Sequence, residues 1–264
     1  MTKLNSRQKF LIDEMIKDEK SQSKILYSAG PYWNYKTKKI LHCLKKDGLQ
    51  NFRGIDSGVG TSYADNLVLD YRNELGFKGR IASFFTRLPY IKKIYDGQIH
   101  YSSSILDSFI KLTAKNFISN EKVQSLIEKY NIENSTEFGC VLKFKYKEKE
   151  YSCHYLNLCN RLNIIDSHIN YKNINTFFEI GGGFGAYTHL LVNNFKNIKK
   201  IIYMDMIPNL FVGTEYLRKF YGEAVKDYIS LKKKETIMFN NNQDLEILCI
   251  APWQIEKLNV EIDH

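Results

Sequence analysis

The sequence has little of what marks membrane-embedded or secreted proteins. No apolar run approaches the roughly 20 residues that a membrane-spanning helix needs, and residues 1–8 lack the apolar core of a signal peptide. The five cysteines are odd in number and irregularly spaced, which argues against a disulfide framework. We therefore expect a cytoplasmic protein without membrane insertion.

The cysteines and histidines also lack the spacing of a metal site. Cys153 and His154, followed by Cys159, form the only arrangement that suggests zinc, and no second pair accompanies them. We interpret the cysteines as buried thiols and predict no metal requirement.

The charge is unbalanced toward the basic side. The 264 residues include 38 Lys and Arg against 29 Asp and Glu, a net charge of +9. This excess favours an anionic partner, such as a nucleotide-linked substrate, a phosphorylated glycan or RNA. Because the lysines are dispersed apart from the run at 232–234, we favour a solvated basic surface over a nucleic-acid patch.

The most informative pattern lies between residues 176 and 206. A short apolar run, 177–180, stops at glycines, as a buried parallel strand does. Residues 181–185 then predict a turn that a ligand can approach closely, because glycine has no Cβ. A helical pattern follows from Ala186 to about residue 194, and a second apolar run, 201–204, ends in Asp205. Strand, glycine loop, helix, strand and acid predict half of a nucleotide-binding α/β unit, with Asp205 accepting hydrogen bonds from ribose hydroxyls.

Two cofactors fit this unit. The pattern Gly181-x-Gly183-x-x-Ala186, with Asp205 about 20 residues further on, satisfies the dinucleotide fingerprint. The same stretch also reads Glu179-x-Gly181-x-Gly183-x-Gly185, which resembles the first motif of class I S-adenosylmethionine methyltransferases. Glu179 favours the second interpretation, because an acid suits the ammonium of a methionine and does not suit a pyrophosphate.

The resemblance extends to a family, the bacterial sugar O-methyltransferases of surface-polysaccharide gene clusters. It rests on Phe178-Glu-Ile-Gly-Gly-Gly-Phe-Gly-Ala-Tyr187, on Tyr203-Met-Asp-Met-Ile-Pro-Asn209 and on Glu215-Tyr216-Leu217 in the next helix. The resemblance implies S-adenosylmethionine as cofactor and assigns these residues to its site: Glu179, Ile180, Gly181, Gly182, Gly183, Phe184, Gly185, Asp205 and Met206. Trp253, after a third strand at 245–250, either lines the adenine pocket or is a packing residue.

The rest of the chain is expected to build a cap and a hairpin around this unit. Residues 1–135 read as a mainly helical cap, with helices at 5–19, 36–46, 80–95, 102–117 and 121–130, the last capped by Asn120. Residues 136–170 are predicted to form a β-hairpin, 142–146 with 151–155, and a helix at 156–169. Residues 171–264 form the Rossmann-like S-adenosylmethionine domain, with a helix after Ile207-Pro208-Asn209 and a fourth strand starting near Val260. Only the first half of a seven-stranded methyltransferase sheet can be counted, so the predicted α/β sheet is incomplete at its C-terminal end.

Methyl transfer to a hydroxyl needs a general base and a held acceptor. We predict Asp56, Asp263 or His264 as the base, against the alternatives of a turn former and a chain end. Aromatic and cationic residues of the cap are candidates for binding a sugar or nucleotide-sugar substrate: Tyr32, Trp33, Lys36 and Arg53. His189, inside the helix after the glycine loop, is interpreted as a packing or solvent-facing residue and not as a catalytic one.

The sequence thus predicts an S-adenosylmethionine-dependent methyltransferase acting on a sugar hydroxyl of a nucleotide-activated, capsule or lipooligosaccharide sugar. The alternatives are an RNA or small-molecule methyltransferase, an inactive shortened methyltransferase and, less favoured, an NAD-dependent oxidoreductase. Nucleic acid is not the expected partner, and a homo-oligomer remains open.

Overall fold

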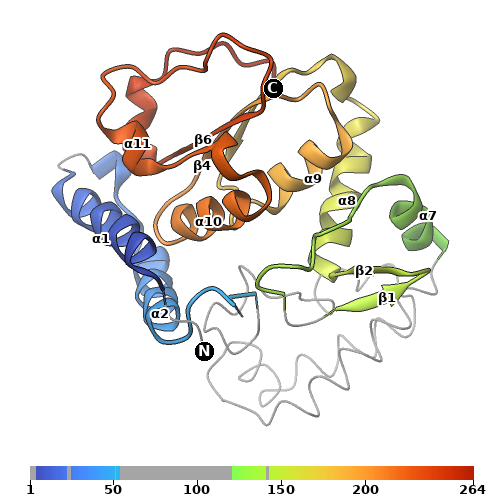
Figure 1. Ribbon diagram of the computed structural model, residues 1–264, viewed down its shortest axis with the longest axis horizontal. Helices are drawn as coiled ribbons and strands as arrows, with labels where there is room; N and C mark the ends of the chain where they lie inside the picture. Colours follow the sequence, from blue (N-terminus) through green and yellow to red (C-terminus); the bar gives the residue numbers. More distant parts are fainter. Residues whose placement is uncertain (1–3, 23–24, 51, 54–120, 141–142) are drawn as a thin grey trace. The chain divides into compact units, whose positions relative to one another are not determined.

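The computed structural model describes residues 4–22, 25–50, 52–53, 121–140 and 143–264 (Figure 1). The chain divides into two compact units, one of Met1–Leu49 with Asp166–His264 and one of Gln50–Ile165. This division differs from the predicted boundaries at residues 135 and 170, because the N-terminal helices pack with the sheet. Several predictions lie outside the described residues: the helices at 80–95 and 102–117, the Asn120 cap and Asp56.

The first unit is built on a parallel β-sheet. Its described part has four strands in the order β3-β4-β6-β5. The strands are β3 (Thr176–Ile180), β4 (Lys200–Met204), β5 (Val225–Lys226) and β6 (Glu246–Ile250). All pairs are parallel, and β3, β4 and β6 pair in register over their five residues. These findings confirm the α/β class and the three strands expected from the apolar runs, whereas the two-residue β5 was not predicted.

Helices cover the two faces of this sheet. On one face lie α9 (Ala186–Asn194) and α10 (Asn209–Tyr221), both predicted from their apolar spacing. The Tyr203 side chain of β4 points toward α10, where its hydroxyl is hydrogen-bonded to the Asn209 carbonyl. On the other face lies α11 (Tyr228–Lys232), which the sequence did not reveal. Successive strand residues therefore face opposite helices, as the alternation of a β-strand requires.

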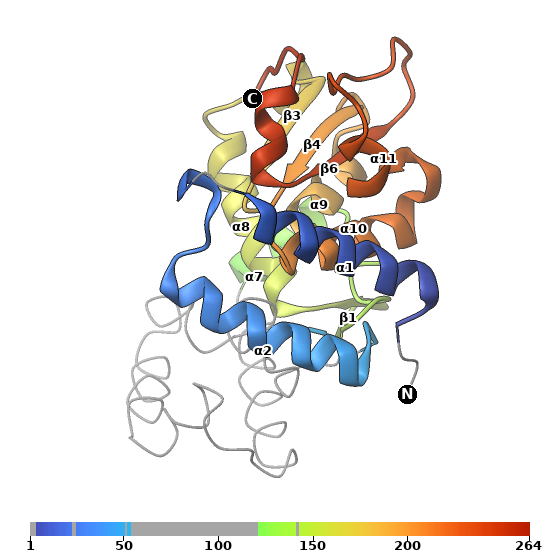
Figure 2. The ribbon, with the colours of Figure 1, turned by 90° about the vertical axis from the view of Figure 1, so that its left-hand side faces the viewer.

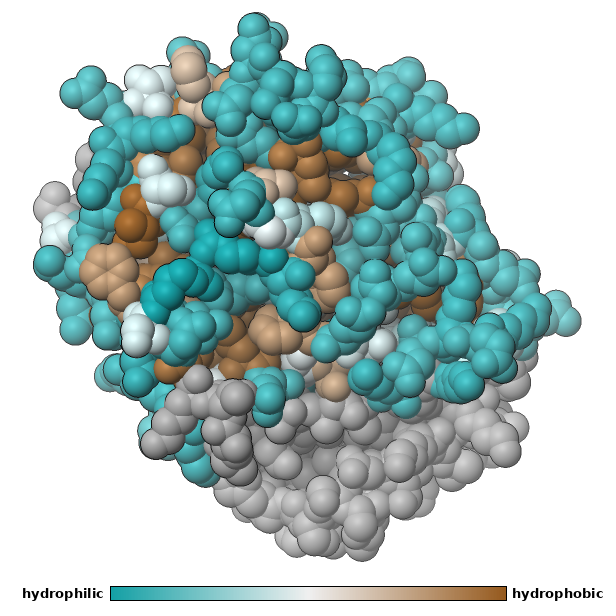
Figure 3. Space-filling model, in the orientation of Figure 1, coloured by the Kyte–Doolittle hydropathy of each residue, from teal (hydrophilic) through white to brown (hydrophobic). Residues whose placement is uncertain are grey.

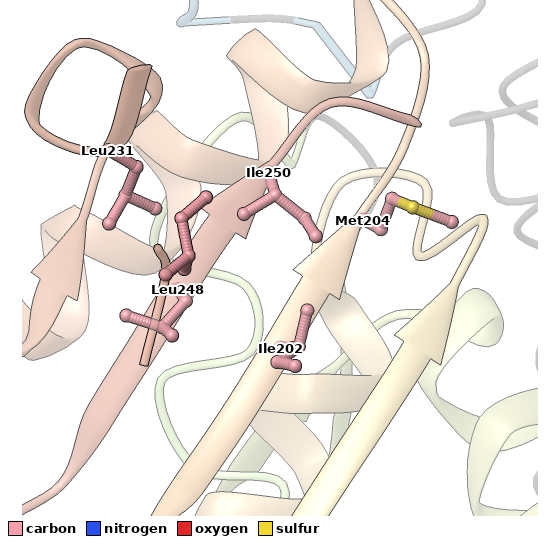
Figure 4. Close-up of a cluster of buried hydrophobic side chains, with 6 residues drawn as sticks. Ile202, Met204, Leu231, Leu248 and Ile250 are labelled. Carbon is pink, nitrogen blue, oxygen red and sulfur yellow. The ribbon is translucent and has the colours of Figure 1, made fainter. Parts of the chain in front are cut away.

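The face toward α11 holds a closed apolar cluster (Figure 4). Its buried members come from β4, β6, α11 and the segment after α11: Ile202, Met204, Leu248, Ile250, Leu231 and Ile237. Five partly buried apolar residues pack against this cluster: Phe178 of β3, Phe239, Leu258, Val260 and Ile262. Burying one such aliphatic side chain contributes about 1.5–3 kcal/mol, so this cluster fixes the strands that carry the glycine loop.

The C-terminal residues lie along the outer edge of β3. The Phe178 amide donates to the His264 carbonyl (2.9 Å), and the Asp263 amide donates to the Thr176 hydroxyl (2.8 Å). Residues 258–264 contain no assigned strand, so the predicted strand from Val260 is not formed. Asp263 and His264 nevertheless run parallel to β3 along its outer edge.

The N-terminal helices belong to the sheet unit (Figure 2). Helix α1 (Ser6–Ser21) carries a capping box of Asn5 and Gln8 and bridges α10 and α11 through ion pairs: Arg7–Glu215, Lys232–Glu14 and Lys232–Asp18. Helix α2 (Pro31–Asp47) starts five residues before the predicted position, because proline suits the first turn of a helix. Short 3₁₀ turns complete the unit at Ile25–Tyr27, Tyr171–Asn173, Gly222–Ala224 and Pro252–Lys257.

In its described part, the second unit contains the predicted hairpin and two helices. The helices are α7 (Glu121–Lys129) and α8 (Cys153–Asp166), and the hairpin joins β1 (Phe144–Tyr146) to β2 (Lys149–Tyr151). Lys147 and Glu148 both have positive φ and form a tight two-residue turn. The hairpin is therefore shorter than predicted. Cys153 and Tyr155, expected in its second strand, lie in α8, where Tyr155, Cys159 and Leu162 are buried at helical spacing.

The basic hairpin does not present an unpaired cationic surface. Each of its lysines has an acidic partner: Lys143–Glu150, Lys145–Glu148, Lys147–Glu128 and Lys149–Glu133. Hydrophilic side chains cover most of the described surface on the face in Figure 3, with apolar ones between them. In the described part of the chain, no helix is long and apolar enough to cross a bilayer.

Candidate functional site

The candidate site is the glycine loop, residues 181–185, at the carboxyl ends of β3 and β4. Glu179 lies next to last in β3, and Asp205 follows β4 directly. The two strands are parallel and paired, so both acids reach the same edge of the sheet. In open α/β sheets this edge is where ligands bind.

The loop glycines have two different roles. A Cβ on Gly182 would lie 2.5 Å from the Tyr203 ring, and a Cβ on Gly185 would lie 2.8 Å from Leu217. These positions exclude a side chain because the core is packed against them. Gly181 (φ 73°) and Gly183 (φ 64°) have left-handed backbone, as Gly185 does (φ 83°), but a Cβ on Gly181 or Gly183 would meet no atom of the described residues within 4 Å. The loop therefore keeps open space beside Gly181 and Gly183, where a ligand can approach the backbone.

Glu179 of β3 is a partly buried acid whose carboxyl group lies beside the start of α9. Burial raises the pKa of its carboxyl group from 4.5 to about 7; hydrogen bonds from the Thr188 hydroxyl and amide lower it, and the charge of Asp205 raises it. The Thr188 hydroxyl donates directly to Glu179 Oε2. Thr188 is the third residue of α9, so Glu179 occupies the positive end of this helix.

Asp205 holds the other side of the loop. Its Oδ2 accepts a hydrogen bond from the Gly183 amide (2.7 Å), and its Oδ1 accepts one from the Met206 amide (2.6 Å). Burial raises the pKa of Asp205 to about 6, and these amides together with Asn209 lower it. Among the described residues, neither Asp205 nor Glu179 forms an ion pair with Lys, Arg or His.

The loop amides are mostly engaged within the protein. The Gly181 amide donates to Met204 O (2.8 Å) and the Gly185 amide to Gly182 O (2.9 Å), while the Gly183 amide is bound by Asp205. A pyrophosphate at a glycine loop needs such amides and the positive end of the following helix. Here the Asp205 carboxylate binds one loop amide, and the Glu179 carboxyl group lies at the positive end of the helix. Because two acids occupy the positions that a pyrophosphate would need, the site favours a cation.

The remaining predicted cofactor residues differ in their exposure. Ile180 is 70% exposed at the end of β3, and Met206 is partly buried. The Phe184 side chain is buried against Tyr216 of α10 (5.1 Å between ring centroids), so only its backbone can face a ligand. Trp253 donates its indole N–H to the Tyr228 hydroxyl (3.1 Å), which supports the packing interpretation of this residue.

The predicted substrate residues fall in two places. Tyr32, Trp33 and Lys36 lie on α2, which is fixed to the loop after Asp205 by a hydrogen bond from the Thr37 hydroxyl to the Ile207 carbonyl (3.1 Å). Arg53 does not fit a substrate role. It is 2% exposed, and its guanidinium donates to Ser135 O (2.7 Å) and Ser152 Oγ (2.6 Å) inside the second unit.

The two bases predicted at the end of the chain, Asp263 and His264, do not lie at the glycine loop, so that prediction is corrected. The Asp263 carboxylate accepts hydrogen bonds from the amides of Asn175 and Thr176, which lower its pKa. The His264 ring packs beside Phe177 (5.6 Å between ring centroids). The Asp263 carboxylate therefore lies at the amino end of β3, about 13 Å from its carboxyl end, because a strand rises about 3.3 Å per residue. The His264 ring lies beside the second residue of β3, about 10 Å from that end.

Other chemistry-bearing residues have structural roles. His189 is buried and its Nδ1 lies 2.7 Å from the Tyr216 hydroxyl, which agrees with the packing interpretation. Within the described ranges, no group of three or more His, Cys, Asp or Glu side chains is arranged to hold a metal ion.

Sequence reasoning missed Thr188 and Tyr203. Thr188 binds Glu179, and the Tyr203 hydroxyl donates to the Gly183 carbonyl. For Thr188 a sequence signal existed: a hydroxyl in the first turn of the helix that follows an acid and a glycine loop. For Tyr203 there was none, because a tyrosine in a strand reads as an ordinary core residue.

In comparisons with known proteins, no family model, no curated protein and no solved structure matches the chain.

Proposed function

We propose that the protein binds S-adenosylmethionine at the glycine loop and transfers its methyl group to a sugar hydroxyl. The observation that carries this proposal is Glu179, a partly buried acid with a raised pKa and no cationic partner among the described residues, beside two glycines that leave open space. The cofactor supplies an activated methyl group on a sulfonium, with an ammonium on its methionine part.

The residues present fit this cofactor chemically. Removing Glu179 and Asp205 from water raises both pKa values, and a bound cation would offset that cost. The ammonium would lie toward Glu179, and Asp205 would accept hydrogen bonds from ribose hydroxyls. Asp205 can do so while it binds Gly183, because a carboxylate has about four lone-pair sites.

The same features disfavour a nicotinamide dinucleotide. Its pyrophosphate would meet the Glu179 carboxylate at the start of α9, and the loop amides that should receive it are engaged with Met204 O, Gly182 O and Asp205. Placing like charges together in a buried site is strongly unfavourable. The methyltransferase interpretation avoids that repulsion.

The sugar acceptor rests on the family resemblance and on the positive net charge of +9. Because the hairpin lysines are neutralised by acids, RNA is the less favoured acceptor. Helix α2, carrying Tyr32, Trp33 and Lys36, is fixed beside the loop after Asp205 and would hold the acceptor. With Asp263 and His264 at the wrong end of β3, Asp56 is the predicted base that remains.

The test is ligand binding measured by calorimetry, with S-adenosylhomocysteine and NADH compared on the same protein. We expect S-adenosylhomocysteine alone to bind. At a hundred times its dissociation constant it should stabilise the fold by about 2.7 kcal/mol. Asp205→Asn should weaken this binding, whereas Asp263→Asn, which changes a carboxylate at the far end of β3, should leave it unchanged.

The outcomes separate the alternatives. NADH binding, or equal binding by both Asp205→Asn and the wild type, would overturn the proposed cofactor. Binding of S-adenosylhomocysteine without transfer of labelled methyl groups to any nucleotide-sugar or acidic glycan would leave the cofactor site standing and overturn the sugar acceptor.

A further inference from the structure

Tyr203 joins the glycine loop to helix α10. This residue lies in β4, an inner strand of the described sheet, and is fully buried. Its hydroxyl donates to the Gly183 carbonyl at 2.6 Å and lies 3.1 Å from the Asn209 carbonyl at the start of α10. A phenol has one proton to donate, so the shorter contact indicates that the loop carbonyl is its main acceptor.

Two glycines make room for this side chain. A Cβ on Gly182 would lie 2.5 Å from the Tyr203 ring, and a Cβ on Gly213 would lie 2.0 Å from its hydroxyl oxygen. Gly213 stands inside α10, where glycine is less favourable than alanine. The position of the tyrosine hydroxyl explains why this helix position carries no side chain.

The peptide groups around Gly183 are thereby held from both sides. The Gly183 amide donates to Asp205 Oδ2 at 2.7 Å, and the Gly183 carbonyl accepts from Tyr203. Gly183 has a φ of 64° and open space beside it. A glycine with no other restraint would sample many conformations, so these two hydrogen bonds select the one that keeps the space open.

We propose that Tyr203 is a positioning residue, which uses its hydroxyl to hold the glycine loop in the ligand-binding conformation. The ligand does not have to order the loop when it binds, and this preorganisation increases affinity. The proposal rests on the proposed function for the identity of the ligand, but the restraint on the loop is a property of the protein alone.

The test is Tyr203→Phe, which removes the hydroxyl and keeps the ring that fills the space beside Gly182 and Gly213. The matched control is Tyr216→Phe. It removes another buried tyrosine hydroxyl, on α10, which lies 2.7 Å from His189 Nδ1, and it keeps the ring that packs against Phe184 of the loop. We expect Tyr203→Phe to bind S-adenosylhomocysteine about tenfold more weakly, which corresponds to about 1.4 kcal/mol. Tyr216→Phe should lose thermal stability and keep wild-type affinity.

A second measurement does not depend on the ligand. Amide hydrogen exchange of the unliganded protein should become at least several-fold faster at residues 181–186 in Tyr203→Phe, and should stay unchanged there in Tyr216→Phe. Gly213→Ala, whose methyl group would displace the Tyr203 hydroxyl, should reproduce the faster loop exchange.

The results can be told apart from a failure of the proposed function. If the wild type does not bind S-adenosylhomocysteine, the proposed function fails, and the exchange experiment still decides the role of Tyr203. Equal loop exchange in Tyr203→Phe and the wild type would overturn the positioning role. So would equal losses of affinity in Tyr203→Phe and Tyr216→Phe, because these would indicate general destabilisation.

Discussion

Replacing Glu179 with glutamine removes its charge and keeps its shape. Burial raises the pKa of this carboxyl group from 4.5 to about 7. One pKa unit corresponds to about 1.4 kcal/mol, so the ionised side chain costs the unliganded protein on the order of 3 kcal/mol above pH 7. The proton on Glu179 therefore stabilises the fold at low pH. This contribution is lost as the pH rises from 4.5 through about 7.

Ligand binding should have the opposite pH dependence. A ligand ammonium binds the ionised carboxylate, of which only about a tenth is present one unit below the pKa. We expect the affinity of the wild type for S-adenosylhomocysteine to be about tenfold weaker at pH 6 than at pH 8. Asp205, with a pKa of about 6, is already half ionised at pH 6. Its ionisation therefore changes the affinity less between pH 6 and pH 8 than that of Glu179.

The Glu179→Gln variant should therefore be more stable than the wild type at pH 8 and bind S-adenosylhomocysteine more weakly there. It should also lose most of the pH dependence between 6 and 8. Chemical denaturation and calorimetry at both pH values measure these effects. The control is Glu215→Gln, a buried acid on α10 that pairs with Arg7; it should lose stability and keep affinity. Wild-type affinity in Glu179→Gln at pH 8 would refute the role given to this charge.

Two further predictions follow from the contacts. Gly183→Ala should fold, at a cost of about 1–2 kcal/mol for its positive φ, and should bind S-adenosylhomocysteine poorly by filling the open space. Gly182→Ala should instead destabilise the protein more strongly by collision with Tyr203; equal melting temperatures in the two variants would contradict this distinction. Arg53→Met should lower stability by about 3 kcal/mol, because buried acceptors lose their donor, with unchanged affinity in a binding titration. A melting temperature equal to the wild type would show that Arg53 is not the structural residue described.

The parts of the fold that the sequence revealed are those with a local signal. The apolar runs ending in glycine and in Asp205 gave β3 and β4, and helical spacing gave α9 and α10 within two residues. The hairpin was found but its length was not. Tyr155 fits both a strand and a helix pattern, and only its burial in α8 distinguishes them. The two-residue β5 is too short to produce any periodic pattern.

The candidate site shows the same division. The sequence by itself determined the chemical groups, because the acid, the glycines and the second acid follow one another at a spacing that strand geometry brings to one edge. Only the tertiary structure decided what surrounds them. Glu179 accepts a hydrogen bond from Thr188 in the first turn of α9, Asp205 binds the loop amide and Tyr203 binds the loop carbonyl. The tertiary structure also placed Asp263 at the amino end of β3, away from the glycine loop. Those contacts join residues on different elements, so they depend on how the elements pack, which no local pattern encodes.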